Sequence, residues 1–212
     1  MKKLGITQRV EIISGYNERR DCLDQNWYAL AQHCGFSPIP LPNLKLDENS
    51  IHQYLSSLSL DAVVLSGGNS LGSVNNSAAD YAPERDSFES AVVNYCITSN
   101  TPLLGVCRGM QMLNYVLGGK LTPVIDHAGT QHTLIVDPDY GKLIAASVNS
   151  YHNWGIKPEG LASNLKAIAH DDKGNIEAFH HQQYRITGIM WHPEREGSIR
   201  TEDAQLIDRF LI

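Results

Sequence analysis

The stretch that decides the fold is residues 102–119, which read PLLGVCRGMQMLNYVLGG. Its first part is apolar and strand-like, its second part has the spacing of an amphipathic helix, and a glycine pair ends it. Cys107 lies where the strand turns into the helix, with Gly105 two residues before it and Gly109 two residues after it. This pattern predicts the cysteine form of a nucleophile elbow, whose tight backbone needs small residues at both glycine positions. A buried structural cysteine beside a glycine turn is the alternative for this stretch alone.

A cysteine nucleophile needs a base and a group that orients the base. Of the nine histidines, His192 is the best placed, because it ends the last apolar strand and is followed by Pro193 and Glu194. Glu194, two residues further on, can lie beside the imidazole and hold its tautomer. By itself His-Pro-Glu also fits a solvated turn. Combined with an elbow on a parallel sheet, it predicts a triad of Cys107, His192 and Glu194.

Acyl transfer also needs donors for an oxyanion. The N–H of Arg108 is one candidate, because Arg108 follows the nucleophile. Gly67 and Gly68 offer a second, since they close the buried strand 61–66 at the edge where open α/β sheets bind ligands. Glycine there lets the backbone approach a reacting centre closely. A plain strand-ending turn is the alternative.

The whole chain of 212 residues predicts one α/β domain, residues 1–212. Strand–helix alternation in the first half predicts a mostly parallel central sheet flanked by helices, and short strands after residue 120 predict antiparallel additions. The expected strands are 4–13, 61–66, 103–106, 133–136, 166–170, 176–179 and 187–192. The expected helices are 24–33, 51–58, 84–94, 109–117 and 202–211. Residues 16–20 are expected to form a polar loop and residues 38–42 an extended segment.

Composition excludes several classes of protein. The chain is 19% charged and 42% hydrophobic, as in ordinary soluble proteins. A net charge of −6 argues against binding to a nucleic-acid backbone. The N-terminus is too polar for a signal peptide, and no apolar run approaches the ~20 residues that span a bilayer. We therefore expect a cytoplasmic protein without membrane attachment, whose four cysteines are reduced thiols.

A zinc site would have to draw on His127, His132 and the pair His180-His181. Adjacent histidines on a strand point to opposite faces and make a poor chelate. We therefore expect ordinary surface histidines, no metal and no other cofactor.

The chain resembles class I glutamine amidotransferases, and within them the γ-glutamyl hydrolase branch typified by γ-glutamyl-γ-aminobutyrate hydrolase. The resemblance is nearly full-length and is carried by ITQRV (6–10), LSGG (65–68), RDSFE (85–89), LGVCRGMQ (104–111), VNSYH (148–152) and GIMWHPE (188–194). It implies the class I glutamine amidotransferase-like fold and the triad named above, with the Gly68 and Arg108 amides as the oxyanion hole. It also implies a small γ-glutamyl substrate. The glutamyl group would be held by residues near the elbow and in the 148–152 block, namely Gly67, Gln111, Ser150, Tyr151 and His152.

The chain departs from the family pattern at one point. These hydrolases usually continue Val-Asn-Ser with two histidines and a glutamine, whereas this chain has Tyr151-His152-Asn153-Trp154. The segment is expected to face the substrate, so the departure bears on the leaving group. Filling of a strand and loop is the alternative role for Ser150 and His152.

Residues 7–10 and 16–27 are similar to a bacterial subgroup associated with surface-polysaccharide biosynthesis, which includes γ-glutamyl-CDP-amidate hydrolases. This similarity implies an anionic leaving group, which Arg9, Arg19 and Arg20 would meet, because guanidinium matches phosphate oxygens well. Solvated loop charges are the alternative for each arginine.

Within the hydrolase branch, a γ-glutamyl-γ-aminobutyrate hydrolase is the alternative to a γ-glutamyl-CDP-amidate hydrolase. Two other functions compete with a stand-alone hydrolase. A glutaminase subunit would pass ammonia to a partner synthetase, and a single expected domain leaves only a separate synthetase. The Cys-Arg-Gly-Met-Gln elbow resembles the hydrolase branch more than such subunits, whose elbow more often has a smaller or neutral residue after the cysteine. A non-catalytic relative is disfavoured, because all three members of the predicted triad are present.

Overall fold

A computed structural model of the protein describes residues 1–16 and 18–212. An eight-stranded sheet with the order β4-β1-β5-β6-β14-β13-β12-β9 forms its centre. Neighbouring strands from β4 to β14 pair in parallel, and the pairs from β14 to β9 are antiparallel. This arrangement confirms the predicted parallel sheet with antiparallel additions. The strands are β1 Lys2–Thr7, β4 Phe36–Leu41, β5 Ala62–Leu65, β6 Leu103–Val106, β9 Ile135–Val136, β12 Leu165–His170, β13 Ile176–His181 and β14 Ile186–Ile189.

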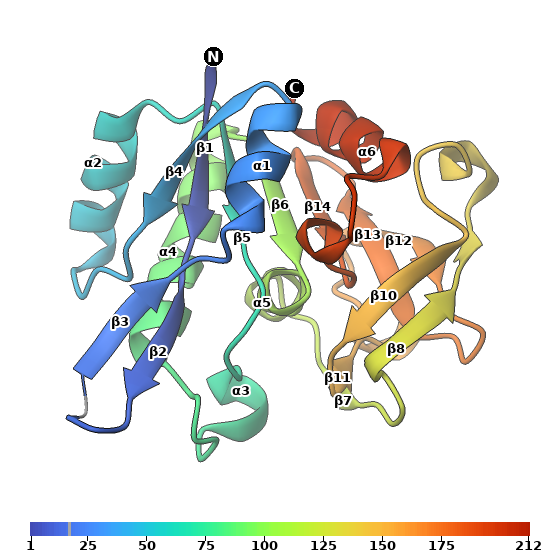
Figure 1. Ribbon diagram of the computed structural model, residues 1–212, viewed down its shortest axis with the longest axis horizontal. Coiled ribbons are helices and arrows are strands. Elements are labelled where there is room, and N and C mark those ends of the chain that lie inside the picture. The colour runs from blue at the N-terminus through green and yellow to red at the C-terminus, as the bar shows by residue number, and fades with distance from the viewer. Residues whose placement is uncertain (17) are drawn as a thin grey trace.

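Helices cover both faces of this sheet (Figure 1). The helices α1 Asn26–His33 and α6 Thr201–Leu211 pack on one face, and α2 Glu48–Leu58, α4 Pro83–Ser99 and α5 Arg108–Val116 pack on the other. Strand β5 contributes to the hydrophobic core on both faces. Ala62 and Val64 lie in the core under α1 and α6, and Val63 and Leu65 lie in the core under α2, α4 and α5. Alternate residues of a strand face opposite sides, so a fully apolar strand serves both layers.

Three two-stranded ribbons extend the molecule around the carboxyl ends of β5 and β6 (Figure 1). The first pairs β2 Arg9–Ile13 with β3 Glu18–Cys22, and the second pairs β8 Ala128–Thr133 with β10 Ser147–Tyr151. The third pairs β7 Thr122–Pro123 with β11 Trp154–Gly155. Short helical turns complete the chain: α3 Gly72–Asn75, η1 Pro138–Tyr140, η2 Pro158–Gly160 and η3 Pro193–Arg195.

Several segments differ from the sequence predictions. The expected strand 4–13 is two strands, because β1 ends at Thr7 and the half-exposed β2 leaves the sheet to pair with β3. The expected polar loop 16–20 contains the start of β3, while its residue Asn17 lies outside the described residues. Strand β10 was missed because its sequence, SVNSY, lacks apolar alternation, and it forms by pairing with β8.

Among residues 1–16 and 18–212, no helix is both long enough and apolar enough to cross a membrane. All four cysteines are free thiols.

Candidate active site

Cys107 lies between β6 and α5 in a backbone conformation that suits glycine. Its φ is 51° and its ψ is −104°, and such a conformation costs a non-glycine residue about 1–3 kcal/mol. Its N–H donates to the carbonyl of Ile189 at 2.8 Å, and its carbonyl accepts from the N–H of Gln111 at 3.0 Å. Strand β14 and helix α5 therefore hold the strained turn together, as an elbow requires.

The glycines on either side of Cys107 are required by close packing. A Cβ atom on Gly109 would lie 2.1 Å from the carbonyl oxygen of Leu65, in the neighbouring strand β5. A Cβ atom on Gly105 would lie 2.6 Å from the carbonyl carbon of Gly109. The elbow can thus approach the sheet this closely only if both positions lack a side chain.

His192 follows β14 and is buried beside the elbow cysteine. Its Nδ1 lies 2.7 Å from Oε1 of Glu194, and both side chains are almost fully buried. Because a carboxylate accepts, Nδ1 carries the proton and Nε2 is left for Cys107. Burial lowers the pKa of His192, but Cys107 and Glu194 outweigh burial and raise it from 6.5 to about 9. The structure thus brings the three predicted triad side chains together, and both Cys107 and Glu194 favour the protonated form of His192.

Asn149 holds the backbone of His192 and was not assigned from the sequence. The N–H of His192 donates to Asn149 Oδ1 at 2.8 Å, and Asn149 Nδ2 donates to the His192 carbonyl at 2.8 Å. The second N–H of that amide donates to Glu196 at 2.7 Å. The only sign of this role in the sequence was that Asn149 is a polar residue next to Val148, in what the structure shows to be the buried part of β10.

Arg85, on α4, fixes the loop that carries Gly67 and Gly68. Its guanidinium is fully buried and donates to the carbonyls of Ser66 at 2.7 Å, Gly67 at 3.1 Å and Gly68 at 2.6 Å. In a trans peptide the N–H points opposite to the C=O. The N–H of Gly68 therefore faces away from Arg85. Arg85 binds the carbonyls of this loop and leaves that N–H without a contact to its guanidinium.

A buried charge network supports this loop from below. Arg85 Nε donates to Glu89 at 2.9 Å, and Arg108 pairs with both Glu89 and Asp86. Two cations and two anions thus neutralise one another in the core. The side chain of Arg108 is occupied there, so its backbone N–H is the part that an oxyanion could use.

Comparison with known proteins identifies the family. The profile of the Peptidase C26 family matches residues 4–194. The chain belongs to the Peptidase C26 family.

Relatives of this Peptidase C26 chain include two named hydrolases. It is 35% identical over 199 residues to a γ-glutamyl-CDP-amidate hydrolase of Campylobacter jejuni, covering 92% of each chain. It is 28% identical over 211 residues to a γ-glutamyl-γ-aminobutyrate hydrolase of Escherichia coli O157:H7, covering 84% of this chain and 81% of the relative. A glutamine amidotransferase structure from Thermotoga maritima superposes with a TM-score of 0.65 at 17% identity, covering 91% of this chain and 76% of that one. These findings confirm the predicted family branch and fold, and the hydrolase relatives support γ-glutamyl amide hydrolase activity.

In this Peptidase C26 chain, the side chains of residues 150–152, which were expected to hold the glutamyl group, point in two directions. Tyr151 is half-exposed, and its ring centroid lies 5.7 Å from that of His192. Ser150 and His152 point the other way and are buried, with the Ser150 hydroxyl donating to the carbonyl of His127. Gln111 is also buried, and its Nε2 donates to the carbonyl of Trp154 at 2.8 Å. The side chain of Tyr151, and not those of Ser150 and His152, is therefore presented beside His192.

A cavity of about 270 Å³ adjoins the triad. Glu194 and Gly67 line it from the triad side. Arg9 and Arg195 also line it, together with the carboxylates of Glu11 and Asp24, and Arg9 pairs with Glu11. The guanidinium of Arg195 also lies 5.0 Å from the ring centroid of Tyr151. Arg195 was missed from the sequence, although it directly follows Glu194.

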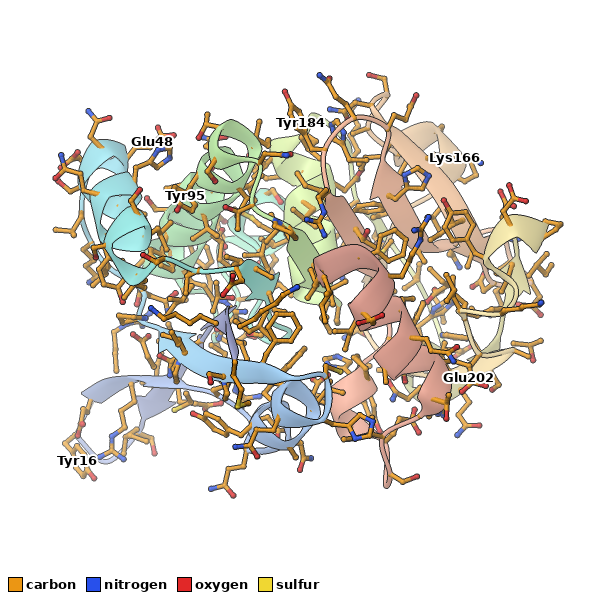
Figure 2. All side chains as sticks on the ribbon, turned by 90° about the horizontal axis from the view of Figure 1, so that it is seen from above. Tyr16, Glu48, Tyr95, Lys166, Tyr184 and Glu202 are labelled. Carbon is orange, nitrogen blue, oxygen red and sulfur yellow. The ribbon has the colours of Figure 1, made fainter. Side chains whose placement is uncertain are left out.

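The described residues that line this cavity do not include Arg19 or Arg20. Arg19 donates to Glu84 on α4, and Arg20 donates to Glu18 at 2.8 Å. Both lie in β3 toward the hairpin tip, which Figure 2 marks with Tyr16. Of the three arginines predicted to meet an anionic leaving group, only Arg9 lines the cavity next to Glu194.

The prediction of surface histidines is wrong for His127 and His181, which are 2% and 6% exposed. His181 Nδ1 accepts from the N–H groups of Gln183 and Tyr184. His127 instead lies with His132, His152 and Glu177 in a buried group. Burial and the neighbouring His127 lower the pKa of His152 to about 3, and burial raises that of Glu177 to about 8.

Replacing Gly67 with alanine is expected to lower kcat for glutamate release at least ~100-fold while the fold persists. The new Cβ would lie 2.5 Å from Cε1 of His192 and displace the imidazole. Steady-state kinetics and a melting curve measure the two effects. Gly197→Ala is the matched control, because a Cβ there meets nothing within 4 Å. Equal rates for the two variants would contradict this placement of His192.

Proposed function

We propose that the protein hydrolyses a γ-glutamyl amide through a thioester on Cys107. The observation that carries this proposal is the strained Cys107 elbow in contact with the His192–Glu194 pair. The Cys107 thiolate attacks the γ-carbonyl, and the Gly68 and Arg108 amides receive the oxyanion. His192 gives its proton to the leaving nitrogen, the C–N bond breaks and the amine departs. His192 then takes a proton from water, which attacks the thioester and releases glutamate and the thiolate.

For the leaving group we propose a nucleotide amidate, with γ-glutamyl-CDP-amidate as the specific substrate. Its hydrolysis would give cytidine diphosphoramidate and glutamate, a reaction that serves capsule polysaccharide biosynthesis. Two observations support this choice. The relative from Campylobacter jejuni bears that activity in its name, and the guanidinium groups of Arg9 and Arg195 line the cavity next to Glu194, among the carboxylates of Glu11 and Asp24. Guanidinium groups bind phosphate oxygens in a bidentate manner.

Replacing Arg9 with glutamine is expected to raise KM for γ-glutamyl-CDP-amidate at least ~10-fold, since one charge-assisted contact contributes roughly 1.5–3 kcal/mol. A neutral substrate, such as γ-glutamyl-p-nitroanilide, should show little change. Arg20→Gln is the matched control, because it removes an arginine of the same hairpin that does not line the cavity. Glutamate release with both substrates measures the difference. If Arg9→Gln affected both substrates equally, the anionic leaving group would lose its support, while the hydrolase activity itself would stand.

The competing function is that of a glutaminase subunit with a separate synthetase. Free glutamine as the best substrate, with release of ammonia stimulated by an added synthetase, would favour that function over the hydrolase.

A further inference from the structure

Three histidines and a glutamate from three stretches of the chain meet in a cluster that does not include Cys107. His127 precedes β8, His132 lies in β8, His152 follows β10, and Glu177 lies in β13. One potential ligand atom from each lies within 4.8 Å of the others. Figure 1 shows the β8–β10 ribbon beside the β13 and β12 end of the sheet, where these segments converge. The fold thus gathers four side chains that could ligate a metal, of which His127, His152 and Glu177 are buried and His132 is half-buried.

Polar atoms of all four side chains lack hydrogen-bond partners among residues 1–16 and 18–212, although His152 Nε2 and Glu177 Oε1 lie 3.7 Å apart. The atoms without partners are Nδ1 of His127, Nε2 of His132, Nε2 of His152 and both carboxylate oxygens of Glu177. Burying one polar atom without a partner is costly, and folded proteins rarely do it. Here four side chains do so together, around a common centre, which indicates that an absent group completes them.

Contacts outside the cluster direct the free lone pairs inward. His152 donates from Nδ1 to the carbonyl of Trp154 at 3.0 Å, so its Nε2 is unprotonated in the neutral ring. Nε2 of His127 lies 3.4 Å from both a carboxylate oxygen of Asp171 and Nδ2 of Asn175, so Nδ1 of His127 is the free atom. Asp171 is held in turn by the N–H groups of Lys173 and Asn175 at 2.9 and 2.7 Å. Metal-binding histidines are typically fixed by such backbone and carboxylate partners.

We propose that His127, His132, His152 and Glu177 bind a zinc ion. Three imidazoles with one carboxylate match the donor preference and fourfold coordination of zinc. Ligand atoms at zinc bond lengths of about 2.0–2.2 Å lie roughly 3.3 Å apart in a tetrahedron, so small side-chain movements complete the site. Four protein ligands leave no open position, so the ion is structural. It ties the β8–β10 ribbon to the sheet and fixes the turn whose Trp154 carbonyl also binds Gln111.

The zinc content of protein prepared without a histidine tag tests this site directly. Elemental analysis should find one zinc per chain, and protein stripped with a chelator should rebind one equivalent. Zinc should also raise the melting temperature of the stripped protein in a concentration-dependent way. Mg²⁺ should do neither, because imidazole ligands disfavour it.

Variants separate the site from general histidine content. His132→Gln and the isosteric Glu177→Gln should each weaken zinc binding at least ~10-fold and remove the thermal shift. His180→Gln is the matched control, since His180 lies on β13 outside the cluster. If His132→Gln fails to fold, Glu177→Gln decides the matter. Folded wild-type protein that takes up no stoichiometric zinc, or a Glu177→Gln variant that binds zinc as tightly as the wild type, would overturn the proposal.

Discussion

Replacing Cys107 with alanine is expected to lower the rate of glutamate release at least ~10⁴-fold, because loss of a nucleophile removes the covalent route entirely. Glutamate release from a γ-glutamyl amide measures the rate, and circular dichroism checks the fold. Cys22→Ala is the matched control, since Cys22 is also a free thiol and lines the adjoining cavity. Undiminished hydrolysis by Cys107→Ala would exclude the thioester mechanism.

Glycine at position 107 provides a second measure of the elbow. With a φ of 51° and a ψ of −104°, alanine retains the strain of the native backbone and glycine releases it. Cys107→Gly should therefore be as inactive as Cys107→Ala, yet melt at a higher temperature. An equal or lower melting temperature for the glycine variant would contradict the strained turn.

The same variants change the titration of His192. Its pKa of about 9 is raised by Cys107 and Glu194 against the effect of burial, so removing the thiol should lower it. A histidine whose pKa is raised in the folded state stabilises the fold fully below pH 6.5 and loses that contribution as the pH rises through about 9. NMR titration of His192 should therefore show a lower pKa in Cys107→Ala. Between pH 6.5 and 9, the Cys107→Ala variant should therefore lose less stability than the wild type.

Replacing Arg85 with methionine is expected to destabilise the protein by about 3–5 kcal/mol, the usual result of removing one member of a buried ion pair. The substitution leaves the carbonyls of Ser66, Gly67 and Gly68 without their donor and adds one uncompensated negative charge to the core. It also releases the loop that carries the proposed oxyanion donor, so kcat should fall in the protein that remains folded. Urea denaturation and steady-state kinetics measure the two effects.

Arg19→Met is the matched control for the Arg85 substitution. It removes the pair between Arg19 on β3 and Glu84 on α4, the helix that carries Arg85, in which the Arg19 side chain is 36% exposed and that of Glu84 9%. Pairs of this kind contribute at most about 1 kcal/mol. Similar losses of stability in the two variants would show that the buried network is no more important than a surface pair.

The central sheet and its helices followed from local patterns. The apolar strands at Val63–Leu65 and Leu103–Val106 are buried on both faces, and such runs are recognisable in any sequence. Local sequence patterns did not predict the two-stranded ribbons. Strands β8 and β10 are largely polar, and their hydrogen-bonded partners lie in distant segments that no local pattern identifies.

The site residues also fall into those that local sequence predicts and those that only tertiary contacts bring together. Sequence by itself placed Cys107 in an elbow and His192 next to Glu194, because steric limits at a tight turn and a spacing of two residues are local properties. Tertiary structure alone decided that Arg85 binds the 66–68 carbonyls, and that Arg9, but not Arg19 or Arg20, reaches the cavity. It alone gathered His127, His132, His152 and Glu177 as well. Contacts between residues far apart along the chain depend on how strands pair and pack, and that information is spread over the whole sequence.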